Sequence, residues 1–250
     1  MIGHGYFPSQ LPPPFSSKSF GDVTSRHLDT IHSSIVNSMC GKNGSPKTTQ
    51  LYKFNLARPK QLNRTLGIPH PGYHFLLSLH IFSQLDDFAL IDAKDQSKSM
   101  SYPLASTFIS DRAFDFQFEW PEITPKRLAS RTGGTHILEA DIARFFPSIY
   151  THSIPWAIHG KLKAKQNRGY QFIGNWIDML IRYSQDGQTL GIPIGPDTSH
   201  LISERILLEV DQAFIQKAWK HHRAIIRIGD GYQIICDSQH AAEASLAILQ

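Results

Sequence analysis

Two aspartates that lie far apart in the sequence each follow a short apolar run. Asp141 ends the segment His136-Ile-Leu-Glu-Ala140, and Asp230 lies at the tip of a predicted hairpin formed by residues 224–229 and 232–236. Two carboxylates brought together can hold a pair of divalent cations, the arrangement used in phosphoryl and nucleotidyl transfer. The pattern therefore predicts such a centre if the fold places residues 141 and 230 within a metal-bridging span of about 4 Å.

Each aspartate also has a purely structural interpretation. Asp230-Gly231 between two apolar runs is a strong hairpin signal, because both central residues of such a turn take positive φ. An aspartate after a strand, as at Asp141, often caps the following helix. The pair Phe145-Phe146 follows Asp141: Phe145 is best explained as a core residue, whereas Phe146 fits a core position and a ring beside a bound sugar equally well.

A loop and a basic stretch add two further candidates. Residues 191–199, Gly-Ile-Pro-Ile-Gly-Pro-Asp-Thr-Ser, combine two glycines with the start of a helix, where a backbone can approach a ligand or simply turn. Arg58, Lys60 and Arg64 form a basic stretch that suits a triphosphate or a solvated face.

The elements that must position these residues are predicted from hydrophobic periodicity. We expect an extended Pro- and aromatic-rich arm tacked onto the body by its aromatic side chains, followed by helices and short strands. The helices are expected at 22–39, 73–88, 170–183, 199–220 (capped by Asp197 or Thr198) and from 241, and the strands at 113–118, 136–140 and in the hairpin. In the helix at 199–220, Ile202, Ile206, Val210 and Phe214 form one apolar stripe. This order predicts an α+β fold, with an antiparallel sheet packed on helices.

Composition excludes several classes of protein. The 250 residues are 41% hydrophobic and 18% charged, which is typical of a globular chain and not of a disordered one. A net charge of +4 is compatible with a polyanionic partner. Two cysteines give no disulfide framework, and neither a signal peptide nor an apolar run long enough to cross a membrane is evident. We therefore expect a soluble, cytoplasmic protein without a membrane partner.

Taken in order, four segments resemble the polymerase signature of reverse transcriptases. Asp141-Ile-Ala-Arg-Phe-Phe146 resembles the first acidic motif, the 191–199 loop resembles the motif written GLPQGxxTSP, and Arg227-Ile-Gly-Asp-Gly-Tyr232 falls where the family has Tyr-x-Asp-Asp. Arg64-Thr-Leu-Gly-Ile-Pro69 resembles the fingers motif RPLGIP. Gly5-Tyr-Phe-Pro8, Leu11-Pro-Pro-Pro-Phe15 and 149–156 resemble the bacterial antiphage-defence branch of the family.

The resemblance implies a right-hand polymerase that lacks its thumb. An N-terminal arm and helix would occupy 1–45, the fingers 46–135 and 155–185, and an incomplete palm 136–154 and 186–250. Because the chain ends just after the catalytic hairpin, we expect a C-terminally incomplete RNA-directed DNA polymerase.

The resemblance also implies roles for individual residues. Asp141 and Asp230, with the backbone carbonyl of Ile142, would bind two Mg²⁺ ions, which Mn²⁺ could replace. Arg64 would contact the triphosphate, Phe146 would serve as the steric gate, and the loop at Ile194 and Gly195 would support the template and the incoming nucleotide. The implied partners are a nucleic-acid template and primer and a deoxynucleoside triphosphate, and a non-coding RNA is a further candidate.

Three residues depart from the family pattern. Gly231 replaces the second aspartate of the hairpin, Ile228 replaces its tyrosine, and Ile194 replaces the glutamine of the loop. An alternative is therefore a catalytically inactive palm–fingers module that binds nucleic acid or a partner protein. A third interpretation is a template-independent nucleotidyl transferase or RNA polymerase on the same palm.

Overall fold

The computed structural model describes residues 1–41, 45–58, 62–84, 98–105, 112–218 and 222–250. The helices are α1 (Lys18–Arg26), α2 (Leu28–Met39), α3 (Pro71–Ser83), α4 (Trp120–Ser130), α5 (Phe145–Ser148), α6 (Ser153–His159), α7 (Lys161–Gln166), α8 (Ile173–Ser184), α9 (Asp197–Ala218) and α10 (Gln239–Leu249). The strands are β1 (Tyr52–Arg58), β2 (Leu62–Ile68), β3 (Pro103–Ala105), β4 (Phe114–Phe116), β5 (His136–Asp141), β6 (Ala224–Ile228) and β7 (Gly231–Cys236). This mixture of helices and small antiparallel sheets confirms the expected α+β class.

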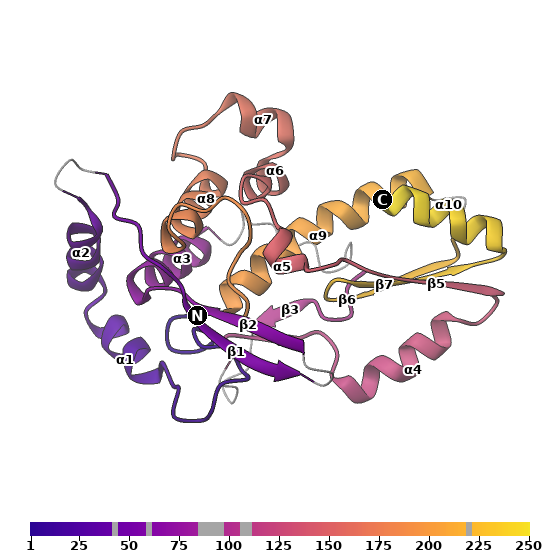
Figure 1. Cartoon of the computed structure of the whole chain (residues 1–250), viewed down its shortest axis with the longest axis horizontal. Coiled ribbons are helices and arrows are strands. Elements are labelled where there is room, and N and C mark those ends of the chain that lie inside the picture. The colour runs from indigo at the N-terminus through magenta and orange to yellow at the C-terminus, as the bar shows by residue number, and fades with distance from the viewer. Residues whose placement is uncertain (42–44, 59–61, 85–97, 106–111, 219–221) are drawn as a thin grey trace.

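The helix α9 joins two parts of an elongated molecule (Figure 1). Its N-terminal half packs against α3 and α6, which in turn pack against α8, and Leu201 and Ile202 belong to the same buried core as Phe75 and Ile177. Its C-terminal half continues to the three-stranded sheet, where Phe214 belongs to a second, smaller core. A single long helix thus fixes the position of the sheet relative to the helical part.

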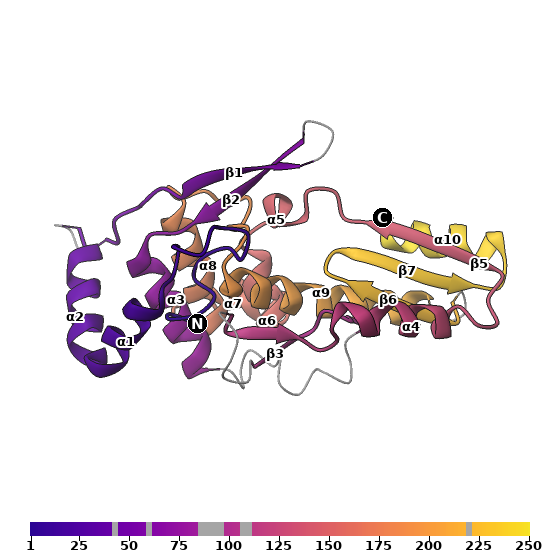
Figure 2. The same ribbon diagram turned by 90° about the horizontal axis from the view of Figure 1, so that it is seen from below.

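The three-stranded sheet has the order β5-β7-β6 and is antiparallel throughout. One face, which carries Leu138, Ile234 and Cys236, packs against α9 and α10. On the other face the Arg127 side chain of α4 donates to Gln233, and Ile137 stays exposed. Figure 2 shows the sheet with α10 on one side and α4 on the other. The alternation along β5 and β7 follows the two-residue period of side chains in a strand.

Two further hairpins lie toward the middle of the molecule. β1 and β2 pair over their full length, with Leu56 opposite Arg64, and β3 pairs with β4. The backbone of residues 98–100 runs along the outer side of β6, where Arg227 donates to the Lys98 carbonyl (2.8 Å) and accepts from Met100 (2.7 Å). This segment satisfies hydrogen-bonding groups that the edge strand β6 would otherwise leave open.

Some predicted elements differ from those observed. The expected helix at 22–39 is two helices, because His27 leaves the helical conformation at φ −133° and ψ 40°. The helix expected from 199 begins at Asp197, so Asp197 is its first residue and not its cap. The predicted stripe on that helix was wrong at Val210, which is exposed, whereas the polar residues Glu204 and Asp211 are buried.

The N-terminal arm packs onto the body of the protein, as expected. The buried Tyr6 hydroxyl donates to the Pro69 carbonyl at 2.6 Å, and the Tyr6 ring lies 4.5 Å from the His74 ring. Gly5 accepts a backbone hydrogen bond from Asp197 at 2.8 Å. The arm therefore covers the start of α9. Among the described residues, no helix is long and apolar enough to cross a membrane.

Candidate nucleotidyl-transfer site

The fold places Asp141, on β5, and Asp230, in the turn before the neighbouring strand β7, at the same end of the three-stranded sheet. Asp141 is the last residue of β5 and pairs with Gly231 across the β5–β7 ladder. The backbone N–H of Ile142 donates to the carbonyl oxygen of Asp230 at 3.3 Å. Burial raises the pKa of the Asp230 carboxyl, and the negative charge of Asp141 adds to that increase. The two carboxylates are thus close enough to repel one another, which a cation between them would relieve.

The turn that carries Asp230 differs from the predicted one. Ile228 pairs with Gly231, so the two central residues are Gly229 and Asp230, not Asp230 and Gly231. Only Gly229 has a positive φ, at 57°. A turn with glycine at its first central position leaves the second residue in ordinary backbone space. Asp230 is therefore presented by an unstrained backbone.

A cavity of about 600 Å³ opens beside this turn. Three residues singled out from the sequence line it: Arg64 from β2, Phe146 from α5 and Asp230. Aromatic side chains form part of the remaining wall, namely Phe116, Phe118 and Trp120. The lining also includes the carboxylates of Asp115 and Glu119. An aromatic wall with a few charged groups is typical of a small-molecule site.

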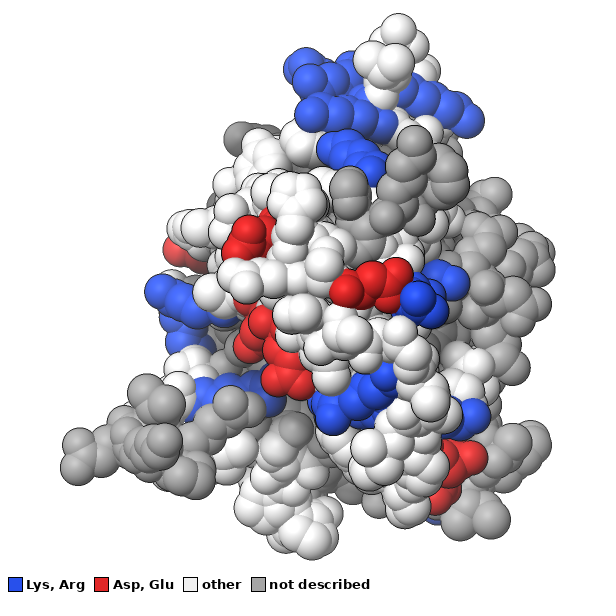
Figure 3. All heavy atoms as spheres, turned by 90° about the vertical axis from the view of Figure 1, so that its right-hand side faces the viewer, with Lys and Arg blue, Asp and Glu red and all other residues white. Residues whose placement is uncertain are grey.

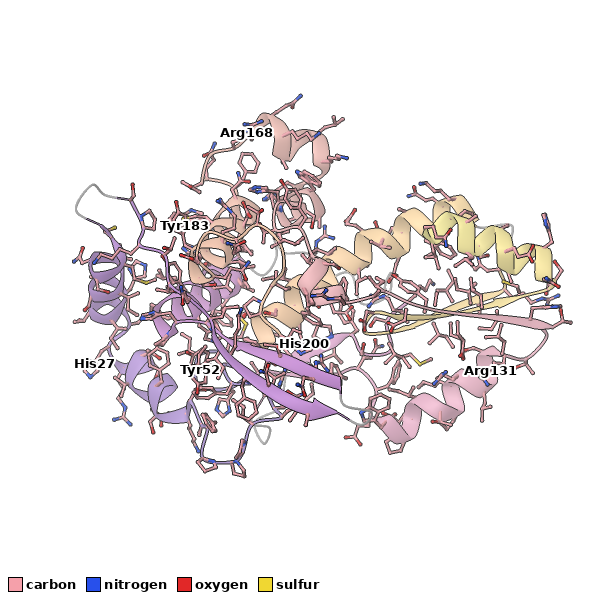
Figure 4. The ribbon with its side chains drawn as sticks, in the orientation of Figure 1. His27, Tyr52, Arg131, Arg168, Tyr183 and His200 are labelled. Carbon is pink, nitrogen blue, oxygen red and sulfur yellow. The ribbon has the colours of Figure 1, made fainter. Side chains whose placement is uncertain are left out.

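Phe146 occupies a defined position at the cavity. Its ring meets the His200 ring edge to face, with centroids 5.5 Å apart, and the Phe145 ring at 5.4 Å. Burial, together with the positive charges of Arg112 and Arg64, lowers the pKa of His200 to about 4. A neutral imidazole therefore supports the Phe146 ring at neutral pH. Figure 4 shows His200 in the middle of the molecule, beside the β1–β2 hairpin. Phe145 is buried in the larger core, as predicted.

A buried ionic cluster, centred on Arg227, contacts the turn between β6 and β7. Arg227 is fully buried and binds Asp211 through Nε and Nη2 (3.0–3.1 Å) and Glu204 through Nη1 and Nη2 (2.9–3.1 Å). Its Nη1 also donates to the Gly229 carbonyl at 2.9 Å, and Ser101 Oγ accepts from the Gly229 N–H at 2.7 Å. The two main-chain polar groups of Gly229 are therefore fixed by side chains.

The charges in this cluster are matched by hydrogen bonds. Burial opposes the positive charge of Arg227, but attraction and hydrogen bonds from Glu204 and Asp211 outweigh it and raise its pKa. Burial raises the pKa of Glu204, which accepts from Ser99. The Tyr232 hydroxyl donates to Asp211 at 2.8 Å, so each carboxylate has more than one donor.

The 191–199 loop does not reach this cavity. Ile194 lines a separate cavity of about 800 Å³ together with Lys53, Arg144 and Gln188, and its carbonyl accepts from Gly67 at 3.0 Å. Gly195 lies beneath Pro8 of the N-terminal arm, and its φ of 129° requires glycine. Of the basic stretch, Lys60 lies outside the described residues.

The residues at this site offer oxygen ligands of the kind that divalent cations take in proteins. Asp141 and Asp230 offer two carboxylates and Ile142 a backbone carbonyl, and oxygen ligands of this kind suit Mg²⁺. Gly231 adds no third carboxylate, and the described part of the chain contains no group of three or more His, Cys, Asp or Glu side chains placed to hold a metal ion. Substrate phosphates would have to complete the coordination, as is usual for Mg²⁺.

Comparison with known proteins leaves the site to be interpreted on its own geometry. No protein-family model matches the chain, and no curated protein matches it.

Sequence reasoning missed the acids and the arginine beneath the turn. Glu204 and Asp211 are seven residues apart on α9, and this spacing places them on the same face of the helix. Arg227 interrupts the apolar run Ile225-Ile226-Arg227-Ile228 at a position that alternation assigns to the interior. A charged residue in such a run is a signal for a buried partner of opposite charge.

Proposed function

We propose that this chain contains the palm and fingers of an RNA-directed DNA polymerase that works by metal-assisted nucleotidyl transfer. The observation that carries the proposal is the juxtaposition of Asp141 with Asp230, which lines a cavity together with Arg64 and Phe146. Three of the four sequence segments that resemble reverse transcriptase motifs thus line one cavity, through Arg64, Phe146 and Asp230.

In this proposal the palm is the β5-β7-β6 sheet with α9 and α10, and the fingers include the β1–β2 hairpin. Asp141 and Asp230 hold the cation, Arg64 binds the triphosphate as a bidentate guanidinium, and Phe146 lies against the sugar. When bound, Mg²⁺ lowers the pKa of the primer 3′-hydroxyl and neutralises developing charge on the phosphates.

The charge of the cavity favours a substrate that arrives with cations. Asp115, Glu119 and Asp230 carry negative charge there, and Arg64 is positive. A bare triphosphate would be repelled by the acids, whereas its Mg²⁺ complex matches them. The cavity therefore suits a metal–nucleotide complex better than a free anion.

The test is primer extension with Mg²⁺ and deoxynucleotides on an RNA template. We expect incorporation by the chain, and its loss in Asp141→Asn and Asp230→Asn. Asp22→Asn, at an exposed position on α1, is the matched control and should extend as well as the unchanged protein. Absence of incorporation under all template and metal conditions would refute the proposal.

A second candidate is an inactive module of the same fold that binds nucleic acid or a partner protein. The observation in its favour is Gly231, which lies opposite Asp141 and supplies no carboxylate. Gly231→Asp separates the two candidates. A gain in nucleotide incorporation supports the polymerase. If the unchanged protein is inactive and the folded Gly231→Asp variant is inactive too, the module is supported.

A further inference from the structure

A third cavity lies between α6, α7 and α8, away from the Asp141–Asp230 site. It measures about 520 Å³ and shares no lining residue with the first cavity. Its lining includes three aromatic and three basic side chains: Tyr150, Trp156, Tyr170, Lys165, Arg168 and Arg182. We refer to it as the aromatic–basic pocket.

The positive charge at the pocket comes from a short segment that contains no acidic residue. Residues 161–168 read Lys-Leu-Lys-Ala-Lys-Gln-Asn-Arg, with four basic residues and no acid. Lys165 and Arg168 are exposed. Lys and Arg side chains gather at the top of Figure 3, at the height where α7 lies in Figure 1, and Figure 4 shows Arg168 at the same end of the molecule. Such a cluster attracts a polyanion.

The aromatic rings offer flat faces next to these cations. Tyr150 and Tyr170 are 44% and 50% exposed, although rings of this size are usually buried. Trp156 lies beneath Lys161 and Lys165, whose ammonium groups are 5.2 and 5.9 Å from its ring centroid. A ring flanked by two cations matches a ligand that joins a planar group to an anion.

The floor of the pocket is neutralised and its rim is held in place. Asp178 is buried, and it accepts from Arg182 Nε at 3.1 Å and lies 2.8 Å from His152 Nδ1. Its negative charge is thus already paired and does not repel an anion. Asn175 Nδ2 donates to the carbonyls of Asn167 and Gly169, which fixes the loop that carries Arg168 and Tyr170. A pre-organised rim lowers the cost of ordering on binding.

We propose that the aromatic–basic pocket binds a nucleotide of single-stranded nucleic acid. Its base stacks on the tyrosine and tryptophan rings, and its phosphate pairs with Lys165 and Arg168. Stacking of bases on aromatic side chains in a basic groove is how proteins hold single strands without reading their sequence. The inference concerns a site separate from the proposed catalytic centre and does not require that centre to be active.

The first experiment is fluorescence anisotropy of a labelled oligouridine with the full chain, in EDTA so that metal-dependent binding at Asp141 and Asp230 does not contribute. Lys165→Ala with Arg168→Ala should weaken binding about tenfold or more and reduce the salt slope by roughly one per lost phosphate contact. Tyr170→Ala should weaken binding at least about fivefold, because stacking contributes about 1–3 kcal/mol per base.

The matched control is Lys18→Ala with Arg26→Ala, which removes the same charge from exposed positions of α1. This control should bind as the unchanged protein does. Equal weakening by both double variants would overturn the proposal, since binding would then depend on net charge alone. So would an unchanged affinity in Tyr170→Ala, or equal competition by an oligoglutamate peptide, which would indicate an acidic peptide ligand.

Crosslinking locates the site directly. An oligonucleotide containing 4-thiouridine should crosslink to peptides that contain Tyr150, Trp156 or Tyr170, and should do so in Asp141→Asn as well. Crosslinks found only around residues 62–68 or 228–236 would place binding at the first cavity and refute a second site. Because the readout is position and not turnover, a chain without polymerase activity can still confirm or refute this proposal.

Discussion

Asp141 lies directly opposite Gly231 in the β5–β7 ladder, one residue away from Asp230. The ladder, and not a flexible loop, therefore sets the separation of the two carboxylates. Register in an antiparallel sheet is strongly specified when one face is buried, because a slip of one residue would turn the apolar side chains of β7 outward. The position of the candidate metal site thus depends on the packing of Ile234 and Cys236 against α9 and α10.

Removal of one carboxylate should abolish cation binding without harming the fold. Burial and Asp141 both raise the pKa of Asp230, so its charge is unfavourable in the folded protein without metal. We expect Asp230→Asn to leave the free energy of unfolding unchanged or slightly increased, and to eliminate the rise in melting temperature that Mg²⁺ or Mn²⁺ gives the unchanged protein. Thermal melts at several metal concentrations measure both effects, with Asp22→Asn as the control. A melting temperature that still rises with metal in Asp230→Asn would show that the ion binds elsewhere.

Loss of the Arg227 guanidinium should be among the most destabilising single changes in the chain. Arg227→Met leaves Glu204 and Asp211 buried without their cation, and breaking a buried ion pair in this way costs about 3–5 kcal/mol. Urea unfolding, followed by circular dichroism, measures the change. The control is Arg223→Met, at the residue just before β6. Its partner Asp237 is exposed, so this change should lower the free energy of unfolding by less than about 1 kcal/mol.

A compensating variant tests the reason for that cost. Adding Glu204→Gln and Asp211→Asn to Arg227→Met removes the unpaired charges, so part of the lost stability should return. If the triple variant is no more stable than Arg227→Met alone, packing and not charge governs this cluster.

The sequence predicted the two aspartates and their strands because alternating apolar residues and a glycine-containing turn are local signals. It did not predict the buried cluster, since the pairing of Arg227 with Glu204 and Asp211 depends on how α9 crosses the sheet. The turn was assigned one residue too late, because Gly229-Asp230 and Asp230-Gly231 both suit a two-residue loop and only the pairing of Ile228 with Gly231 decides between them. The helix α4 was not predicted because it contains Pro121 and Pro125. Pro121 lies in the first turn, where proline is tolerated, but Pro125 lies inside the helix. Gly195 was assigned to nucleotide binding from its motif, yet the N-terminal arm covers it, a contact between residues nearly two hundred positions apart.

The contact between Gly195 and the arm leads to a stability prediction. A Cβ at residue 195 would lie 2.6 Å from Pro8 Cβ, so Gly195→Ala must displace the arm as well as adopt a φ that favours glycine. Gly187→Ala is the matched control, because Gly187 also has a positive φ, of 75°, but has open space around its Cβ position. We expect Gly187→Ala to cost about 1 kcal/mol and Gly195→Ala clearly more. Limited proteolysis near the N-terminus should accelerate only in Gly195→Ala, and equal rates would contradict this account of the arm.

The buried His74 should make the protein less stable in mild acid. Burial lowers the pKa of His74 to about 3, below its ordinary value of 6.5, so the folded protein holds the ring neutral. Between these two values the unfolded chain binds a proton that the folded chain does not, and stability therefore falls as the pH is lowered through this range. The loss attributable to His74 should be on the order of 1 kcal/mol per pH unit between about pH 6 and 4. His74→Gln, which keeps a donor for the Met1 carbonyl, should flatten the curve of unfolding free energy against pH in that window, with the exposed His240→Gln as the matched exchange. A curve for His74→Gln that runs parallel to that of the unchanged protein would show that this histidine is not the source of acid sensitivity.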